Sequence, residues 1–231
     1  MKKLILLLTF TQFFFFGNAQ DCLNTEFLKE GTKWEVSNYD KKGKYTGVTN
    51  YQTLSENHSG GNYVWELKFK SLDDKGEETM AESVTTLTCE NGIFKIDMTE
   101  FIPNETKEGF KDMEVEMKST NLNFPNNFNM DSKLEDGTIN VTTFSSGIKI
   151  MSMDMTIKDR VIEGVETIET SAGSFKCLKI NQKTLLEIGF IKREISSTSW
   201  FLPGFGVVKS ESFNNKGKSM GSSVLTSMTK P

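Results

Sequence analysis

The sequence predicts an all-β protein built on one large curved antiparallel sheet, half-barrel or clam-like in shape, with at most one or two short helices. Two observations support this fold class. Short stretches alternate apolar and polar residues with a period of two, which places successive side chains on opposite faces of a half-buried strand. Turn-forming residues separate these stretches at close intervals, as in hairpins rather than in strands joined by crossover helices.

Three stretches show the alternation most plainly, near residues 64–70, 151–158 and 186–190. In each, apolar residues occupy every second position and polar or charged residues fill most of the positions between them. We therefore expect three strands with one face in the core. The apolar positions are Trp65, Leu67 and Phe69; Met151, Met153, Met155 and Ile157; and Leu186, Ile188 and Phe190.

The segments between these stretches contain glycine, asparagine or aspartate, which tolerate a positive φ. Residues 99–112 fit neither pattern and predict a loop or short helix, followed by a strand at 113–119. The predicted turns are at 40–43, 73–76, 90–92, 136–137 and 214–217, with two more at 172–174 and 203–204.

The first nineteen residues have the three parts of a secretory signal peptide. Lys2 and Lys3 supply positive charge, residues 4–16 are mostly apolar, and the small residue Ala19 precedes the predicted cleavage site. The apolar run is shorter than the roughly 20 residues that cross a bilayer, which argues against the alternative of a membrane-spanning anchor. We predict a signal peptide over 1–19 and a single exported β domain over 20–231, periplasmic or secreted.

Three cysteines follow the predicted cleavage site. Gln20 and Asp21, directly before Cys22, oppose lipid modification, so we do not expect a lipoprotein. An oxidising compartment favours one disulfide and leaves one thiol. Cys22 would tether the N-terminus and Cys89 ends a predicted strand, whereas Cys177 lies in a strand-like stretch where a thiol packs as a small hydrophobe. We predict the pair Cys22–Cys89, although spacing alone does not determine connectivity.

Charge and composition exclude several classes of partner. The formal charge is −4, and loss of the two signal-peptide lysines makes it −6. Nucleic-acid binders need clustered Lys and Arg, so we expect no nucleic acid as partner. The mild acidic excess indicates solubility.

No catalytic apparatus is recognisable. The single histidine, His58, lies in a polar segment predicted to be a hairpin tip, without an inferable nucleophile or orienting carboxylate. One His and three dispersed Cys do not make a zinc site, and residues 131–137 depart from the EF-hand pattern at Lys133. No phosphate-binding glycine loop occurs. We predict a protein that is not an enzyme and that has no metal and no cofactor.

The apolar content suggests a different role. Methionine and phenylalanine are numerous, at 11 and 18 residues. Methionine adapts to irregular apolar shapes, which suits a pocket for lipophilic ligands, although ordinary sheet core explains the same stripe. The candidate ligand-binding residues are Trp65, Phe69, Met151, Met153, Met155, Trp200 and Phe205.

Segments 22–34, 159–177 and 200–209 resemble the TapB-like family of exported bacterial proteins of unknown function. The resemblance is most specific around 163–166 and 172–175. It implies a periplasmic or surface location in bacteria of the Bacteroidetes type, and a curved sheet akin to the lipoprotein carriers LolA and LolB, whose half-barrel holds acyl chains. It implies no catalytic residues. Within the matched segment, Arg160 is expected to pair with Glu163 or Glu166.

Two functional hypotheses follow. The first is a non-enzymatic cell-envelope protein that binds a lipid or other apolar ligand in a cleft of the curved sheet. The alternative is a structural module that binds an envelope protein and no small molecule. An enzyme of unrecognised type remains a third, less supported possibility.

Overall fold

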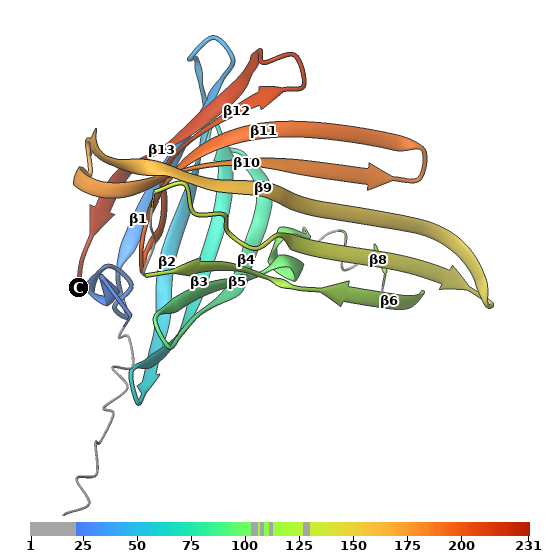
Figure 1. Ribbon diagram of the computed structural model, residues 1–231, viewed down its shortest axis with the longest axis horizontal. Coiled ribbons are helices and arrows are strands. Elements are labelled where there is room, and N and C mark those ends of the chain that lie inside the picture. The colour runs from blue at the N-terminus through green and yellow to red at the C-terminus, as the bar shows by residue number, and fades with distance from the viewer. Residues whose placement is uncertain (1–21, 103–105, 107–108, 111–112, 127–129) are drawn as a thin grey trace, which may run out of the picture.

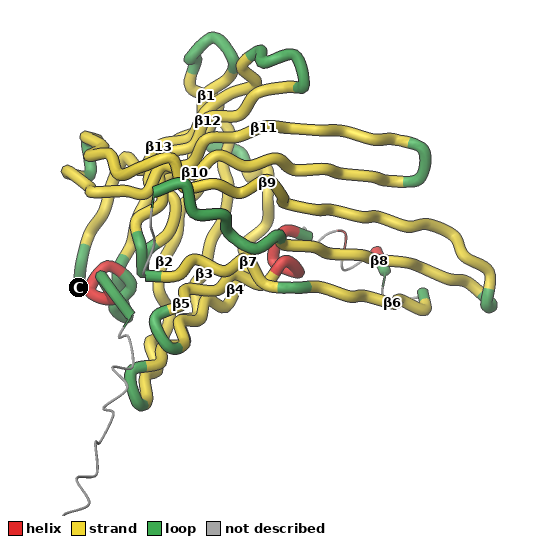
Figure 2. The backbone as a smooth tube through the Cα atoms, viewed as in Figure 1, coloured by secondary structure: helices red, strands yellow, loops and turns green. Residues whose placement is uncertain are grey.

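The computed structural model describes residues 22–102, 106, 109–110, 113–126 and 130–231. In these ranges thirteen strands form one antiparallel sheet, with two short 3-10 turns, η1 (Thr25–Phe27) and η2 (Met98–Phe101), so the all-β prediction is confirmed (Figures 1 and 2). The strands are β1 (Lys33–Asp40), β2 (Tyr45–Ser59), β3 (Asn62–Asp73), β4 (Glu78–Glu90), β5 (Ile93–Asp97), β6 (Glu114–Ser119), β7 (Asn121–Pro125), β8 (Gly137–Ser145), β9 (Ile148–Thr170), β10 (Gly173–Ile188), β11 (Ile191–Leu202), β12 (Gly206–Asn214) and β13 (Ser219–Thr229).

The sheet curls until its two ends meet on one segment of chain. The strand order is β6-β8-β9-β10-β11-β12-β13-β1-β2-β3-β4-β5-β7, so the consecutive strands β6 and β7 lie at opposite ends. Between them, Thr120 donates its N–H to the Thr138 carbonyl at 2.9 Å and accepts from the Met98 N–H at 3.2 Å. This residue therefore links both ends, and the predicted large curved sheet is confirmed in a nearly closed form.

Three hairpins use the same local turn. Asp40, Asp73 and Asn214 each accept hydrogen bonds from the backbone N–H groups two and four residues later, at 2.8–3.0 Å. The glycine three positions later has φ between +72° and +85°, a conformation that costs other residues more. The side chain and the glycine together explain why the chain reverses at 40–43, 73–76 and 214–217, as the sequence predicts.

One predicted hairpin is wrong. Residues 136–137 do not join two paired strands, because the strand before them, β7, pairs with β5, whereas β8 pairs with β6 and β9. Gly137 is instead the first residue of β8, and a Cβ there would lie 2.4 Å from Leu122 Cδ2 and 2.9 Å from Met98 Sδ. The absence of a side chain at Gly137 therefore permits Leu122 and Met98 to pack closely where the sheet closes.

The structure describes part of the region after β5, where residues 99–112 fit neither sequence pattern. Residues 98–101 form η2, and the predicted strand at 113–119 appears as β6, Glu114–Ser119. The rest of the predicted loop or helix falls largely outside the described residues, as does the predicted signal peptide. No helix in the described ranges has the length and apolar character needed to cross a membrane.

A bulge in β9 turns a charged residue into the core. Asp159 has φ +53°, and the register between β9 and β10 shifts at this point. Strict alternation from the buried Ile157 would place position 159 inward, but the bulge moves the inward position to Arg160, which is 1% exposed. Alternation resumes with the buried Ile162.

The buried guanidinium of Arg160 joins β9 to the segments around residues 123 and 135, near the point where the sheet closes. It donates to the Glu135 carbonyl at 2.5 Å and to the Asn123 carbonyl at 3.4 Å, and lies 4.6 Å from the ring centroid of Phe124. Burial lowers the pKa of Arg160 to about 10, while Asp136 and Glu135 oppose this shift, so the group stays charged. Lys179, and not Arg160, forms the ion pairs with Glu163 and Glu166, so the predicted local ion pair is replaced by these carbonyl contacts.

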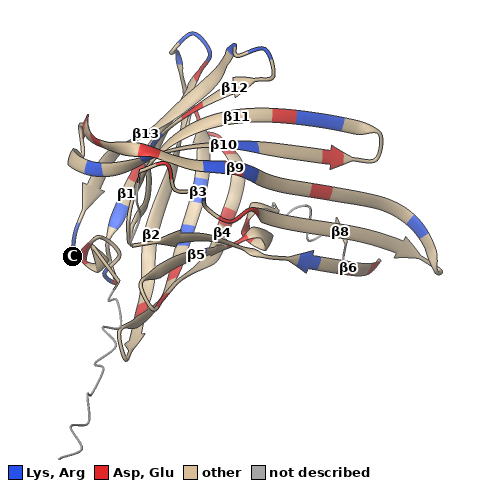
Figure 3. Cartoon of the chain, viewed as in Figure 1, with Lys and Arg blue, Asp and Glu red and all other residues tan. Residues whose placement is uncertain are grey.

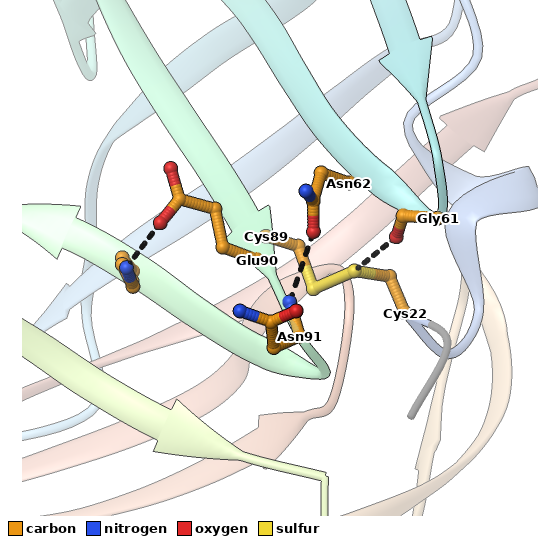
Figure 4. The surroundings of a disulfide bond; sticks show 7 residues. Cys22, Gly61, Asn62, Cys89, Glu90 and Asn91 are labelled. Carbon is orange, nitrogen blue, oxygen red and sulfur yellow. Dashed lines mark hydrogen bonds and ion pairs between the residues drawn. A yellow bond between two sulfur atoms is a disulfide. The ribbon is translucent and has the colours of Figure 1, made fainter. Parts of the chain in front are cut away.

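A disulfide joins Cys22, at the start of the described chain, to Cys89 at the end of β4 (Figure 4). Cys22 Sγ lies 3.5 Å from the Gly61 carbonyl oxygen, a contact without a hydrogen bond because a disulfide sulfur carries no proton. The Asn91 N–H donates to Asn62 Oδ1 at 3.0 Å, so the β2–β3 and β4–β5 turns lie together beside the bond (Figure 4). The remaining cysteine, Cys177, is a buried free thiol.

Candidate functional site

The inner face of the curved sheet forms an open cavity of about 530 Å³. This volume lies within the roughly 300–1,000 Å³ typical of small-molecule sites. The cavity opens to solvent at its lining residues Phe101 and Val207, which are 44% and 40% exposed. The other lining residues are Trp34, Val36, Tyr51, Leu67, Phe69, Thr85, Leu87, Ile96, Glu100, Gln182, Ser197, Ser199, Phe205, Gly206, Ser210, Ser212 and Ser223.

Three rings in register form one wall. Trp34 on β1 pairs with Tyr51 on β2, and Tyr51 pairs with Phe69 on β3. The Trp34 and Tyr51 rings stack at 5.1 Å between centroids, and Tyr51 and Phe69 at 5.7 Å. We call these three residues the aromatic triad. Because direct cross-strand neighbours point to the same face, three adjacent strands present a continuous row of stacked rings to the cavity.

The triad continues toward the N-terminal segment. Phe205 contacts Trp34 edge-on at 5.4 Å between centroids and Phe27 at 5.9 Å. The 203–204 turn holds this segment in place, since the Asn24 side-chain amide donates to the Pro203 carbonyl at 2.7 Å. A Cβ at Gly204 would lie 1.6 Å from the Leu23 carbonyl oxygen. Glycine at that position therefore allows the N-terminal segment to pack against the turn that carries Phe205.

Hydroxyl groups form a second wall on β11, β12 and β13. Ser197 pairs with Ser212, Ser199 with Ser210, and Ser210 with Ser223, so the five side chains share the inner face. We call them the serine patch. The hydroxyls of Ser210 and Ser223 lie 2.9 Å apart and bond to each other. No hydrogen bond within the described residues engages the side chains of the other three.

The cavity is almost free of charge. Among the described residues that line it, Glu100 is the only ionisable one apart from Tyr51. Burial raises the pKa of the Tyr51 phenol, which therefore stays neutral at physiological pH. Acidic and basic residues elsewhere are interspersed along the strands and turns (Figure 3). The inner face thus combines an apolar wall with a neutral hydrogen-bonding wall.

The structure brings together two of the seven predicted ligand-binding residues. Phe69 and Phe205 line the cavity. Trp65 shares the inner face but is fully buried, stacked on Tyr63 at 5.3 Å and tilted against Phe94 at 6.2 Å between centroids. It belongs to the packed core rather than to the cavity lining.

The methionine stripe lies elsewhere on the inner face. Met151, Met153 and Met155 on β9 pair with Thr143, Val141 and Ile139 on β8, respectively. All three are half-buried, and none lines the cavity. Met153 and Met155 also pair with Ile188 and Leu186 at the end of β10. In Figure 1, β8 to β11 extend together away from β1 to β5. These methionines are therefore separated from the aromatic triad.

Trp200 lies on the outer face of the sheet. Its indole N–H donates to Glu166 Oε2 at 2.7 Å, and Lys209 Nζ lies 4.3 Å from its ring centroid. Lys179 contacts Glu166 at 3.1 Å and Glu163 at 3.7 Å. The ammonium groups of Lys179 and Lys209 lie over the ring, and these lysines help to explain why Trp200 is only 6% exposed on this face.

Sequence reasoning missed Trp34, Tyr51 and the serine patch. The triad could have been found from aromatic residues on successive predicted strands, had their register been known. The serines carry no such indication, because a row of serines on a strand is typical of a solvent-facing side.

Known catalytic groupings are not evident in the described ranges. His58 lies near the end of β2 and stacks on Tyr63 at 5.5 Å between centroids. No group of three or more His, Cys, Asp or Glu side chains suited to a metal ion occurs among the described residues.

An antiparallel sheet that curls around a neutral, two-sided cavity defines the class of this protein. The chain belongs to the DUF3108-like family, whose sequence model matches residues 29–225. No curated protein matches the chain.

Two solved structures are similar in fold. A protein of Bacteroides fragilis, described as exported and with a YmcC-like fold, is 23% identical, with a TM-score of 0.69 over 87% of this chain and 97% of its own. A protein of Parabacteroides distasonis, described as a lipoprotein, is 23% identical, with a TM-score of 0.72 over 91% of this chain and 100% of its own. These descriptions name neither the TapB-like family nor LolA and LolB, so those finer resemblances stay predictions.

Proposed function

We propose that this chain is an exported, non-enzymatic protein of the cell envelope that binds a lipophilic ligand in the cavity of its curved sheet. The observation that carries the proposal is the aromatic triad. Its three residues line the open cavity, and Trp34, which is 6% exposed, also belongs to the packed core. Apolar surface of this kind gains free energy when a ligand removes it from water.

Export is supported by the signal-peptide pattern of residues 1–19 and by the descriptions of the two similar structures. The disulfide bears on the form of the mature protein. A lipoprotein carries its lipid on the sulfur of its first cysteine, but the Cys22 sulfur is bonded to Cys89. One sulfur cannot do both, so the proposed mature protein begins at Gln20, is periplasmic or secreted, and is not a lipoprotein. Intact mass of the exported protein tests this directly.

The test of binding uses two adjacent residues on opposite faces of β13. Ser223 lines the cavity and Ser222 does not, so Ser223→Phe narrows the cavity and Ser222→Phe is the matched control. The delipidated protein is incubated with envelope lipid extract and analysed by native mass spectrometry. We expect bound mass on the wild type and on Ser222→Phe, and less on Ser223→Phe. Absence of bound mass on the wild type would contradict the proposal.

A second candidate function, binding of an envelope protein, is favoured by exposed apolar residues at the β8–β9 and β10–β11 turns. Ile148 and Ile191 are 68% and 60% exposed, and Phe190 is fully exposed. These turns lie at the projecting end of the sheet in Figure 1. If this function holds, Ile148→Asp with Phe190→Asp abolishes capture of a stoichiometric envelope protein, whereas Lys216→Asp at a different turn does not.

A further inference from the structure

The two walls of the cavity would bind chemically different parts of one ligand. The aromatic triad offers no hydrogen bond through its stacked faces, whereas Ser197, Ser199 and Ser212 offer hydroxyls that no described residue engages. A hydroxyl both donates and accepts, so a row of them recognises neutral polar groups with the same dual character. A wholly apolar ligand would leave these groups without partners, which is unfavourable in a desolvated site.

Charge in the cavity argues against an ionic headgroup. No Lys, Arg or His is among the lining residues that the structure describes, and Glu100 lies at the exposed end of η2 beside Phe101. A carboxylate or phosphate taken into this site would lose its hydration without gaining a cation, and it would face the charge of Glu100. Binding of an acidic headgroup in the cavity is therefore disfavoured, whereas binding of a neutral hydroxylated headgroup is not.

We propose, on the basis of the function proposed above, that the ligand is a neutral amphiphile: an acyl or alkyl chain against the aromatic triad and an uncharged polyhydroxylated headgroup against the serine patch. Gln182 contributes to the same side. It lies opposite the β9 bulge at Asp159, lines the cavity, and offers an amide that both donates and accepts. The amide extends the hydrogen-bonding wall from β11 onto β10.

The experiment compares headgroups at constant chain length. Monolaurin has an uncharged glycerol headgroup and laurate a carboxylate, and both carry a twelve-carbon chain. Binding is measured at pH 7, below the critical micelle concentrations, by the change in fluorescence of Trp34, with Trp34→Phe used to identify the contribution of that residue. We expect monolaurin to bind at least about tenfold more tightly than laurate, because the latter pays for desolvation of its charge.

A paired substitution tests the serine patch itself. Ser197→Ala with Ser212→Ala removes two facing hydroxyls and no large side chain, and should weaken monolaurin binding about tenfold while changing laurate binding less than about twofold. The matched control is Ser196→Ala with Glu211→Ala, on the opposite face of the same strands. n-Dodecyl glucoside provides an uncharged sugar headgroup. Tighter binding of either neutral amphiphile than of laurate supports the inference. The affinity of n-dodecyl glucoside relative to that of monolaurin then distinguishes a sugar from a glycerol headgroup.

The outcomes separate this inference from the proposed function. If laurate binds as tightly as both neutral amphiphiles, or if the serine pair does not affect their binding, the headgroup assignment is overturned while lipophilic binding stands. If none of the three compounds binds and envelope lipid extract also leaves no bound mass, both proposals are overturned. Circular dichroism of each variant confirms that the sheet is intact before binding is compared.

Discussion

Loss of the disulfide is expected to destabilise the protein strongly. The bond joins residues 67 positions apart, which restricts the unfolded chain. In the chain-entropy model a loop of this size corresponds to about 15 cal/mol/K, or about 4 kcal/mol at 25 °C. That is a large part of the roughly 5–15 kcal/mol by which globular domains are stable. The variant to test is Cys22→Ser with Cys89→Ser, which leaves neither sulfur unpaired.

Native contacts add to this expectation. Cys89 is 1% exposed, and serine in its place would bring a buried hydroxyl into an apolar site. Other contacts of the N-terminal segment survive the change, including the burial of Leu28 and the packing of Phe27 on Phe175 at 6.1 Å between centroids. The segment therefore stays docked when the variant folds, and the main effect acts through the unfolded state.

Urea unfolding followed by circular dichroism measures the effect. We expect the midpoint to fall by more than about 1 M relative to wild type. Reductant should lower the wild-type midpoint to slightly above that of the variant, because the reduced wild type keeps a thiol at position 89 instead of a buried hydroxyl, and it should leave the variant unchanged. Cys177→Ser is the control, because it removes a cysteine while keeping the bond. A double variant within about 1 kcal/mol of wild type would refute the chain-entropy argument for this bond.

Three further predictions concern single residues. Gly204→Ala should cost at least about 3 kcal/mol in urea unfolding, because the new Cβ meets the Leu23 carbonyl, whereas Gly217→Ala, with similar φ and open space, should cost only about 1–2 kcal/mol; equal costs would contradict the packing argument. Burial raises the pKa of Cys177 to about 12, so iodoacetamide at pH 8 should modify it only after unfolding, as read by mass spectrometry, and rapid native labelling would show that the thiol is accessible. Hydrogen bonds from Trp200 and Lys179 lower the pKa of Glu166 below 4.5, so its contribution to stability is present above that pH and lost as pH falls through the folded-state pKa. The difference in unfolding free energy between wild type and Glu166→Gln should shrink from pH 7 to pH 3, and a constant difference would contradict this linkage.

Where strands are regular, alternation predicts their faces correctly, but the prediction at 186–190 is wrong at its end: β10 stops at Ile188, and Phe190 is fully exposed in the turn that follows. Trp65 and Leu67 are buried on β3 and Glu66 is exposed, as the period of two requires. The turns at 40–43 and 73–76 are predictable for an equally local reason, since the aspartate and glycine that make them lie within four residues.

Alternation fails where a single backbone angle changes the face. The left-handed φ of Asp159 turns Arg160 inward, and no sequence pattern distinguishes this residue from other aspartates in strands. The resulting buried charge looked like one half of a surface ion pair. Its carbonyl partners come from β7 and from residue 135, which only the closed sheet brings near.

Residue type also misleads about the inner face. Trp200 is apolar enough to suggest the cavity, yet two lysines cover it on the outside. The serine patch is polar enough to suggest solvent, yet it lines the cavity. Both errors have one physical cause: an open cavity is neither packed core nor bulk solvent, so hydrophobicity alone does not tell which residues line it.

Closure of the sheet at Thr120 explains how the cavity can stay open without an unpaired strand on either side of it. The strands that form its walls, β1 to β5 and β10 to β13, are paired on both edges, and the ends of the sheet meet on residues 114–125. Entry of the proposed ligand would therefore require no separation of wall strands. The exposed lining residues Phe101 and Val207 lie where the cavity opens to solvent, between η2 and the start of β12, so access to the cavity there does not depend on opening of the sheet.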